Sequence, residues 1–347
     1  MLRAVPKPGH VRAVVPATEY GVVAAATLAD AWGLPGAGTS AAAVLRDKSA
    51  LRAHADSAGL PQPRWRPAES VQDVVAFRAG HGGRCVVKPV DRQASLGVRL
   101  LDAEDDAAVA WKAATTADEP RMRARDTGAG RFLVEERLSG PEVSVECLVD
   151  RGELLFVNVT EKLLQSGPSP VELGHVVPAA LPPAVIGELT RLMRRLIDST
   201  GFGSGVLHAE WILVDGVRPH LVECAGRLPG DSIDVLIDLA YGGRMVADLL
   251  GVLEGRGAPT RGPAVAGAAI RFLSAPPGVV RTVTGLAESR TAEGVREVEL
   301  TAEPGTVIRE PTSSWDRIGH LLATGTTAVH AARNAACAAG LIEVRTC

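Results

Sequence analysis

The sequence has few aromatic residues, little net charge and no long apolar run. Aromatic residues make up 3% of the 347 positions, and the formal net charge is -3. No basic stripe interleaved with aromatic side chains is present, so we expect no nucleic-acid partner. The longest apolar stretches, at 11–16 and 22–29, are much shorter than the roughly 20 residues that cross a bilayer. With no charged and then apolar leader at its start, the sequence predicts a soluble, cytoplasmic protein with no membrane partner.

Cysteine is also scarce, and its spacing fits neither a disulfide frame nor a zinc site. The chain has 5 cysteines, an odd number, and no CxxC motif. At least three of them lie inside apolar, strand-like runs. This favours reduced, buried thiols. The five positions are Cys85, Cys147, Cys224, Cys337 and Cys347.

Lysine is rare enough for each lysine to be informative. Of 37 basic residues, only Lys7, Lys48, Lys88, Lys112 and Lys162 are lysines. A position that keeps lysine where arginine is the rule suggests a need for a compact point charge. Three of the five become candidate phosphate ligands below.

A chain of this length predicts roughly two or three compact units. The run at 11–16 and the alanine-rich stretch at 19–32 predict a strand and a helix, which make one α/β unit. A complete nucleotide-binding domain needs several such units, so the N-terminal domain looks incomplete. The segment 117–130 is expected to be a mobile loop, and 255–263 a domain boundary. We expect further helices at 41–58, 70–79, 103–115, 184–200, 232–240 and 245–250, and strands at 84–90, 98–101, 132–135, 143–149, 154–159, 206–214 and 220–225.

Two glutamates on a predicted hairpin form the strongest constellation. Glu210 lies on one strand and Glu223 on the next, and Asp215-Gly216 is a two-residue turn signal between them. That turn would place Val214 opposite Val217. The two carboxylates would then be diagonal neighbours on one face, roughly 7–8 Å apart. A four-residue loop would keep them on one face, whereas a three-residue loop would not.

Like charges on one face of a sheet repel unless a cation lies between them, and Mg²⁺ prefers one or two carboxylates plus phosphate oxygens. Arg227 extends the same face and could hold an anion beyond the metal. A solvent-exposed hairpin with surface glutamates would show the same spacing. The apolar residues that flank both glutamates favour a covered hairpin instead.

A second constellation places Lys88 near the end of an apolar strand, followed by the small-residue turn 94–98. Such a turn lets backbone N–H groups approach phosphate oxygens. The turn alone is weak evidence, since it matches neither GxGxxG nor GxxxxGK[ST]. The lysine could equally reach to water from a strand end. The polar connector at 135–142 exposes backbone groups that suit an adenine edge, although many charged surface turns look alike.

Together these stretches resemble the ATP-grasp superfamily, and within it the carboxylate-amine ligases that include bacterial L-amino acid (dipeptide) ligases. The resemblance runs from about residue 11 through nearly the whole chain. AAIRFLSAPPG and TSSWDRIGHLLATG are similar to the small closing domain of those ligases. The other matching stretches are RDKSALRAHADSAGLPQPRW at 46–65, CVVKPVDRQASLGVRLL at 85–101, FLVEERLSGPEVSVECLV at 132–149, VTEKLL at 159–164, VELGHVVPA at 171–179 and GVLHAEWILVDGVRPHLVECAGRLPGDSI at 205–233.

The resemblance implies an ATP-grasp fold of the α/β (α+β) class. Its expected parts are a truncated N-terminal α/β segment at 1–65, a small subdomain with the phosphate loop at 66–135, a central subdomain with the metal site at 136–260, and a small C-terminal α+β domain at 261–347. The implied cofactors are ATP and Mg²⁺, with Mn²⁺ as a substitute. The implied partners are a small-molecule carboxylate and an amine, and relatives are often homodimers.

The resemblance also implies residue roles. Carried over, Lys48 and Lys88 contact the ATP phosphates, and Ser95 and Gly97 belong to the loop that folds over them. Glu135, Glu136 and Leu138 form the adenine hinge, and Glu142 binds ribose. Glu210 and Glu223 hold magnesium. Arg227 contacts the substrate carboxylate or its acyl phosphate, and Lys162 and His175 line the phosphate and substrate region.

The implied reaction is ATP-dependent amide formation on an amino acid in specialised metabolism, through an acyl phosphate, with release of ADP and phosphate. One alternative is a bicarbonate-activating carboxylase or carbamoyl-type enzyme. Another is a non-catalytic ATP-binding module. That reading is favoured by the short N-terminal domain and by Ala225, because the family usually has asparagine there. The phosphate loop also has less glycine than is common in the family.

Overall fold

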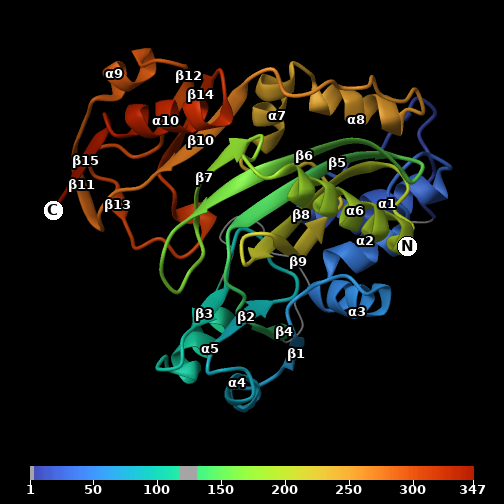
Figure 1. Cartoon of the computed structure of the whole chain (residues 1–347), viewed down its shortest axis with the longest axis horizontal. Helices are drawn as coiled ribbons and strands as arrows, with labels where there is room; N and C mark the ends of the chain where they lie inside the picture. The colour runs from blue at the N-terminus through green and yellow to red at the C-terminus, as the bar shows by residue number, and fades with distance from the viewer. Residues whose placement is uncertain (1–3, 118–130) are drawn as a thin grey trace.

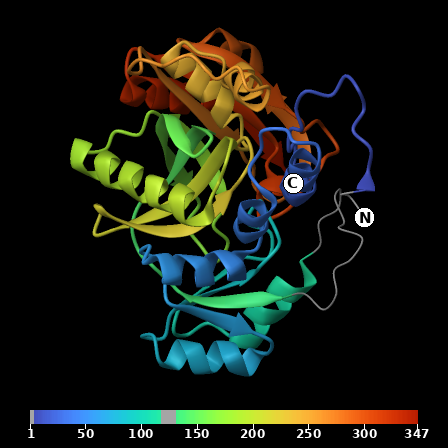
Figure 2. The same cartoon turned by 90° about the vertical axis from the view of Figure 1, so that its right-hand side faces the viewer.

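A computed structural model describes residues 4–117 and 131–347, and Figures 1 and 2 show it from two sides. The segment predicted as a mobile loop, 117–130, lies outside the described residues except for Ala117. Three sheets organise the described chain: a four-stranded sheet in the order β1-β4-β2-β3, an eight-stranded sheet in the order β12-β14-β10-β7-β6-β5-β8-β9, and a three-stranded sheet in the order β13-β11-β15.

The four-stranded sheet forms the small unit at the bottom of Figure 1. A capping box at Ser70 and Asp73 starts α4, and Asp106 caps α5 by accepting from two backbone N–H groups. Both helices pack on the apolar side of the sheet, around Phe77 and Leu101. The elements are β1 Trp65–Ala68, α4 Val71–Ala79, β2 Cys85–Pro89, β3 Arg99–Leu101, α5 Ala107–Thr116 and β4 Phe132–Glu136.

The eight-stranded sheet is antiparallel and crosses the middle of the molecule. Three of its strands come from beyond residue 261, so they extend the same sheet across the expected start of the C-terminal domain. The proposed domain division therefore stays a prediction. The strands are β5 Glu142–Asp150, β6 Glu153–Leu164, β7 Glu172–Val177, β8 Gly205–Val214, β9 Arg218–Ala225, β10 Gly267–Leu273, β12 Val295–Leu300 and β14 Gly319–Gly325. Of these, β7 was not predicted, and no individual strands were predicted for the region of β10, β12 and β14, which was expected only to be a small α+β domain.

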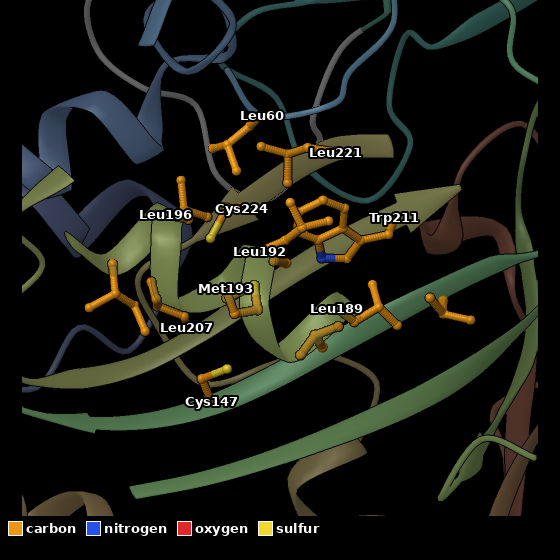
Figure 3. Close-up of a cluster of buried hydrophobic side chains, with 14 of the residues drawn as sticks. Leu60, Cys147, Leu189, Leu192, Met193, Leu196, Leu207, Trp211, Leu221 and Cys224 are labelled. Carbon is orange, nitrogen blue, oxygen red and sulfur yellow. The ribbon is translucent and has the colours of Figure 1, made fainter. Parts of the chain in front are cut away.

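Helices cover both faces of this sheet. On one face, α6 packs with two N-terminal helices, and Figure 3 shows its leucines lying against the strands. On the other face, α7 and α8 pack over the C-terminal end of β5 and the N-terminal end of β8. The opposite ends of these two strands carry polar residues that line the cavity described below. These helices are α6 Pro183–Thr200, α7 Ile233–Tyr241 and α8 Met245–Leu253.

The N-terminal segment is helical, and the strand predicted at 11–16 is wrong, because those residues form neither strand nor helix. An apolar run becomes a strand only when another strand pairs with it. The helix predicted at 41–58 is two helices, which meet at Asp47. That residue has extended backbone and caps the second helix by accepting from Ala50 N–H. The helices are η2 Glu19–Gly21, α1 Val22–Ala31, α2 Thr39–Arg46 and α3 Lys48–Ala58.

The last part of the chain adds a small sheet and two helices at the upper left of Figure 1. Its elements are β11 Gly278–Thr284, α9 Leu286–Thr291, β13 Val307–Ile308, η3 Ser314–Asp316, α10 Ala328–Ala339 and β15 Glu343–Thr346. All five cysteines are free. Cys85, Cys147 and Cys224 are buried, as predicted, whereas Cys337 and Cys347 are exposed. No helix among the described residues is both long and apolar enough to cross a bilayer.

The packing of α6 predicts a sharp contrast between two adjacent residues. Leu192 is fully buried against the large sheet, whereas the Arg191 side chain is 56% exposed. We expect Leu192→Ala to lower the free energy of unfolding by about 2–5 kcal/mol, because it leaves a cavity. Arg191→Ala removes only a surface ion pair and should leave the free energy of unfolding nearly unchanged. Urea denaturation of both variants measures this, and equal losses would contradict the assigned core.

Candidate functional site

One cavity of about 470 Å³ lies between the four-stranded and eight-stranded sheets and reaches the segment around η3. It gathers side chains from α3, β2, the turn after β2, both strands of the carboxylate hairpin and the loop after β9. Of the predicted site residues, all except Gly97 line it: Lys48, Lys88, Ser95, Glu135, Glu136, Leu138, Glu142, Lys162, His175, Glu210, Glu223 and Arg227.

The carboxylate hairpin has its two glutamates on one face, but not in the predicted register. The turn contains three residues, since Val214 pairs with Arg218 instead of Val217. A three-residue turn alone would send the glutamates to opposite faces. A β-bulge reverses this, because Trp211 pairs with Leu221 and Glu210 pairs with Glu223, so Val222 is the extra residue. The two carboxylates are therefore direct cross-strand partners instead of diagonal neighbours.

A lysine neutralises each of these carboxylates. Lys162 Nζ lies 2.7 Å from Glu210 Oε1, and Lys48 Nζ lies 2.9 Å from Glu223 Oε2. Burial raises the pKa of Glu210, but Lys162 and His208 more than offset it, so the pKa lies well below its ordinary value. Burial also raises the pKa of Glu223, but Lys48 more than offsets it, so this pKa lies below its ordinary value as well. Both groups are therefore carboxylates at neutral pH.

This donor set fits a divalent cation. Two ionised carboxylates from opposed positions face one cavity, and Mg²⁺ takes one or two carboxylates together with phosphate oxygens. Ala225 offers no side-chain oxygen beside them. Its cross-strand partner is His208, whose Nδ1 lies 2.9 Å from the buried Glu146. Burial lowers the pKa of His208, but Glu146 and Glu210 raise it to about 9, which places a positive charge beside Glu210.

Lys88 belongs to a buried ion-pair network that the sequence did not reveal. Its Nζ lies 2.8 Å from Glu135 Oε2, and Arg52 binds the same carboxylate through Nε at 2.7 Å and a terminal nitrogen at 3.1 Å. All three side chains are at most 5% exposed. Burial raises the pKa of Glu135, but the two cations lower it to about 2. The anion fixes the position of the lysine.

Two of the three residues predicted for the adenine hinge, Glu135 and Glu136, use their side chains to bind cations of the protein. The Glu135 side chain is occupied by Arg52 and Lys88, and its backbone lies in β4 between β1 and β2. The Glu136 carboxylate accepts hydrogen bonds from Arg64. Irregular backbone begins only after β4, so Leu138 is the one of the three predicted hinge residues that lies in the connector. Its contact with a nucleotide stays a prediction.

The turn after β2 is tied to two distant segments. Ala94 and Ser95 both have φ of 56°, and Ser95 Oγ donates to Pro170 O at 2.9 Å. The Ser314 N–H donates to Ala94 O at 3.2 Å, which joins the turn to η3. Gly97 has φ of 77°, and an added Cβ would lie 3.0 Å from Ala114 O. Its role is therefore conformational, and it does not line the cavity.

Lys162 lies among three carboxylates. Glu142 and Glu172 each lie 3.6 Å from its Nζ, in addition to Glu210. Burial lowers the pKa of Lys162, but the carboxylates raise it well above its ordinary value. Burial raises the pKa of Glu142 above its ordinary value. Lys162 lowers this pKa, but the neighbouring carboxylates Glu210 and Glu172 raise it again. The ribose contact predicted for Glu142 stays a prediction.

The predicted His175 and Arg227 each have an acidic partner that sequence reasoning missed. His175 Nε2 lies 3.0 Å from Asp231 Oδ2, and Arg317 donates to both oxygens of Asp231. Arg227 Nε donates to Glu19 Oε2 at 2.7 Å. Glu19 and Arg317 lie far from their partners in the chain, so no spacing predicts these pairs. Asp231, Glu172 and Arg317 do lie inside stretches that carried the resemblance, although none of the three was assigned a role.

A separate acidic cluster lies on the surface. Glu297, Glu299 and His320 offer ligand atoms within 4.8 Å of one another, on β12 and β14. Both glutamate side chains are more than half exposed. Exposed acidic groups at this spacing are common without a ligand, so we assign no function to them.

Comparison with known proteins identifies two regions. A family model described as "ATP-grasp domain" matches residues 82–234, and one described as "L-amino acid ligase C-terminal domain 2" matches residues 271–346. D-alanine–D-alanine ligase of Ectopseudomonas mendocina is 32% identical over 231 residues, which are 59% of this chain and 68% of that protein. Alanine–anticapsin ligase of Bacillus subtilis is 25% identical over 244 residues, covering 64% of this chain.

Among solved structures, L-amino acid ligase from Bacillus licheniformis has the same fold. Its TM-score is 0.78 at 18% identity, and the match covers 97% of this chain and 81% of that one. The chain spans only part of several curated relatives, for example 49% of the Bacillus subtilis alanine–anticapsin ligase.

The depressed pKa of Glu135 predicts how stability depends on pH. A carboxylate with a folded-state pKa of about 2, against an ordinary 4.5, stabilises the fold above pH 4.5, and this contribution is lost as the pH falls toward 2. We expect Glu135→Gln to cost about 3 kcal/mol of unfolding free energy at neutral pH. The deficit should shrink as the pH falls below 4.5.

Denaturation curves of the wild-type protein and Glu135→Gln between pH 2 and pH 7 measure this. Glu104→Gln, at an exposed position, is the control and should show a small, pH-independent difference. A Glu135→Gln deficit that stays constant across this range would show that the carboxylate is not held ionised by its neighbours.

Proposed function

The chain belongs to the ATP-grasp ligase family, and on that basis we propose that it joins a carboxylate to an amine in an ATP-dependent reaction. The opposed pair Glu210 and Glu223 carries this proposal, because it faces the cavity that also contains Lys48, Lys88 and Arg227. Two carboxylates and several fixed cations around one cavity suit a metal-bound triphosphate.

We propose that the carboxylate substrate is an amino acid. The printed names of the relatives describe ligases of alanine and of L-amino acids. In this chain, Glu19 holds Arg227 at the cavity wall, where its guanidinium could bind a carboxylate or an acyl phosphate. The amine would be a second small molecule. A cytoplasmic location and a homodimer stay predictions.

The proposed reaction has two steps. A substrate carboxylate oxygen attacks the γ-phosphorus of ATP, the bond from that phosphorus to the bridging oxygen breaks, and ADP leaves. The amine nitrogen then attacks the acyl carbon, phosphate leaves, and the nitrogen loses a proton. Lys48 and Lys88 would neutralise phosphate oxygens, and Arg227 would orient the acyl group. A bound Mg²⁺ would neutralise further phosphate charge.

The covering segments would keep water from the acyl phosphate. The turn after β2 and η3 both line the cavity, and hydrogen bonds tie the turn to Pro170 and to Ser314. Water exclusion favours attack by the amine over hydrolysis.

A turnover assay tests this proposal. The protein is incubated with ATP, Mg²⁺ and a panel of amino acids and amines, singly and in pairs, while ADP and phosphate are measured and products are identified by mass spectrometry. We expect ADP and phosphate to form in equal amounts only when both an acid and an amine are present. Bicarbonate-dependent ATP hydrolysis would support the carboxylase alternative, and ATP binding without turnover would support a non-catalytic module.

Two variants separate binding from chemistry. We expect Lys88→Met to weaken ATP binding about tenfold, because it removes the buried charge that we propose binds phosphate. Glu223→Gln should lower turnover by about 100-fold or more, with a smaller change in ATP affinity. Glu297→Gln, in the surface cluster, is the control and should leave both unchanged. If Lys88→Met and Glu223→Gln both kept wild-type turnover, the site would be assigned wrongly.

A further inference from the structure

Arg52 is a fully buried arginine on α3 that reaches both sheets at the edge of the cavity. It is 1% exposed. Toward the four-stranded sheet, it binds both oxygens of Glu135. Toward the eight-stranded sheet, its two terminal nitrogens donate to Leu221 O at 2.8 Å and to Val222 O at 2.7 Å. A guanidinium spreads its donors over three nitrogens in a fixed planar fork, so it can reach separate acceptors in two directions, whereas a lysine has a single nitrogen.

The two backbone acceptors lie at the β-bulge in β9. In a regular strand, successive carbonyls point to opposite edges, so one guanidinium cannot bind two in a row. It can do so here because Val222 is the extra residue of the bulge. β9 is also the edge strand of its sheet, so no neighbouring strand in the described part of the chain supplies donors on that side. Arg52 supplies the missing donors to the two carbonyls, and its hydrogen bonds favour the bulged conformation.

The bulge determines where Glu223 points. Without it, Val222 would pair with Glu210, and Glu223 would turn to the other face of the sheet. With it, both Val222 and Glu223 line the cavity, while Leu221 and Cys224 on either side stay in the core. The contacts of Arg52 with β9 therefore hold the second predicted metal carboxylate in place.

The other side of Arg52 acts on Lys88. Glu135 Oε2 accepts from an Arg52 terminal nitrogen and also lies 2.8 Å from Lys88 Nζ. Removing the arginine would leave this carboxylate held by the lysine alone, deep in the protein. The lysine would then be drawn more strongly toward Glu135 and away from a phosphate.

We propose that Arg52 is a positioning residue that couples the phosphate site at Lys88 to the metal site at Glu223. This rests on the proposed function, since it assumes that nucleotide and metal share the cavity. Its consequence is a linkage: Arg52 sets how much a divalent metal tightens nucleotide binding. Glu135 contacts Arg52 and Lys88 but not the bulge in β9, and a glutamine at this position still offers an oxygen to Arg52, so Glu135→Gln should leave that linkage in place.

Calorimetric titration with ADP tests the coupling without relying on turnover. ADP affinity is measured in EDTA and in saturating Mg²⁺, and the ratio of the two Kd values is the coupling factor. We expect Arg52→Met to weaken ADP binding in EDTA and to reduce the coupling factor about tenfold or more, as loss of a group supporting a metal ligand does. Glu135→Gln should weaken ADP binding in EDTA but keep the wild-type factor.

Two more variants make the result specific. Arg52→Lys keeps a positive charge for Glu135 but cannot hold both carbonyls, so it should restore ADP binding in EDTA without restoring the coupling factor. Arg191→Met removes another arginine that binds a glutamate through two nitrogens, on the surface of α6, and should match the wild-type protein. Circular dichroism confirms that each variant is folded before titration, and Arg52→Lys carries the test if Arg52→Met does not fold.

The outcomes separate the two proposals. If the wild-type protein binds no ADP, or binds it with no effect of Mg²⁺, the proposed function fails. If the wild-type protein shows coupling and the folded Arg52 variants keep it, the function stands and the role of Arg52 is overturned. Full rescue of the coupling factor by Arg52→Lys would also overturn it, because charge alone would then suffice.

Discussion

Two carboxylates that face each other across one hairpin are the constraint on which the rest of the site depends. Like charges in direct cross-strand contact destabilise a sheet unless cations offset them. Here Lys48 and Lys162 supply those cations, each from a different element, and each in hydrogen-bonding distance of one glutamate. The N-terminal helix α3, the strand β6 and the hairpin are thereby brought to one place. The fold is arranged around a concentration of charge that a metal-bound nucleotide would complete.

Much of the fold followed from local patterns, and so did the choice of the two glutamates. The strands of the hairpin and the helices over it lie close to their predicted bounds. The shared face of Glu210 and Glu223 was predicted for a wrong reason, since the turn is one residue longer than expected and the bulge at Val222 corrects the parity. No glycine marks this bulge. Its support comes from Arg52, 170 residues earlier in the chain.

What the sequence did not reveal depends on contacts between distant segments. Glu135 looked like part of a hinge, yet its carboxylate holds Lys88 and Arg52. Glu19 lies outside every stretch that carried the resemblance, and Arg317 lies inside one but had no assigned role, yet they bind Arg227 and Asp231 near the cavity. The apolar run at 11–16 formed no strand, because pairing and not composition decides that outcome. Ion pairs that join separate elements have no characteristic spacing, so only the folded arrangement identifies them.

The most direct test of the opposed glutamates is to locate a metal in crystals grown with ADP and Mn²⁺. An anomalous difference map recorded at a wavelength where manganese scatters shows the ion independently of any assumed ligand. We expect a peak bound by Glu210 and Glu223, next to the phosphates of ADP. A map with ADP in the cavity and manganese only at the surface cluster of Glu297, Glu299 and His320 would contradict it.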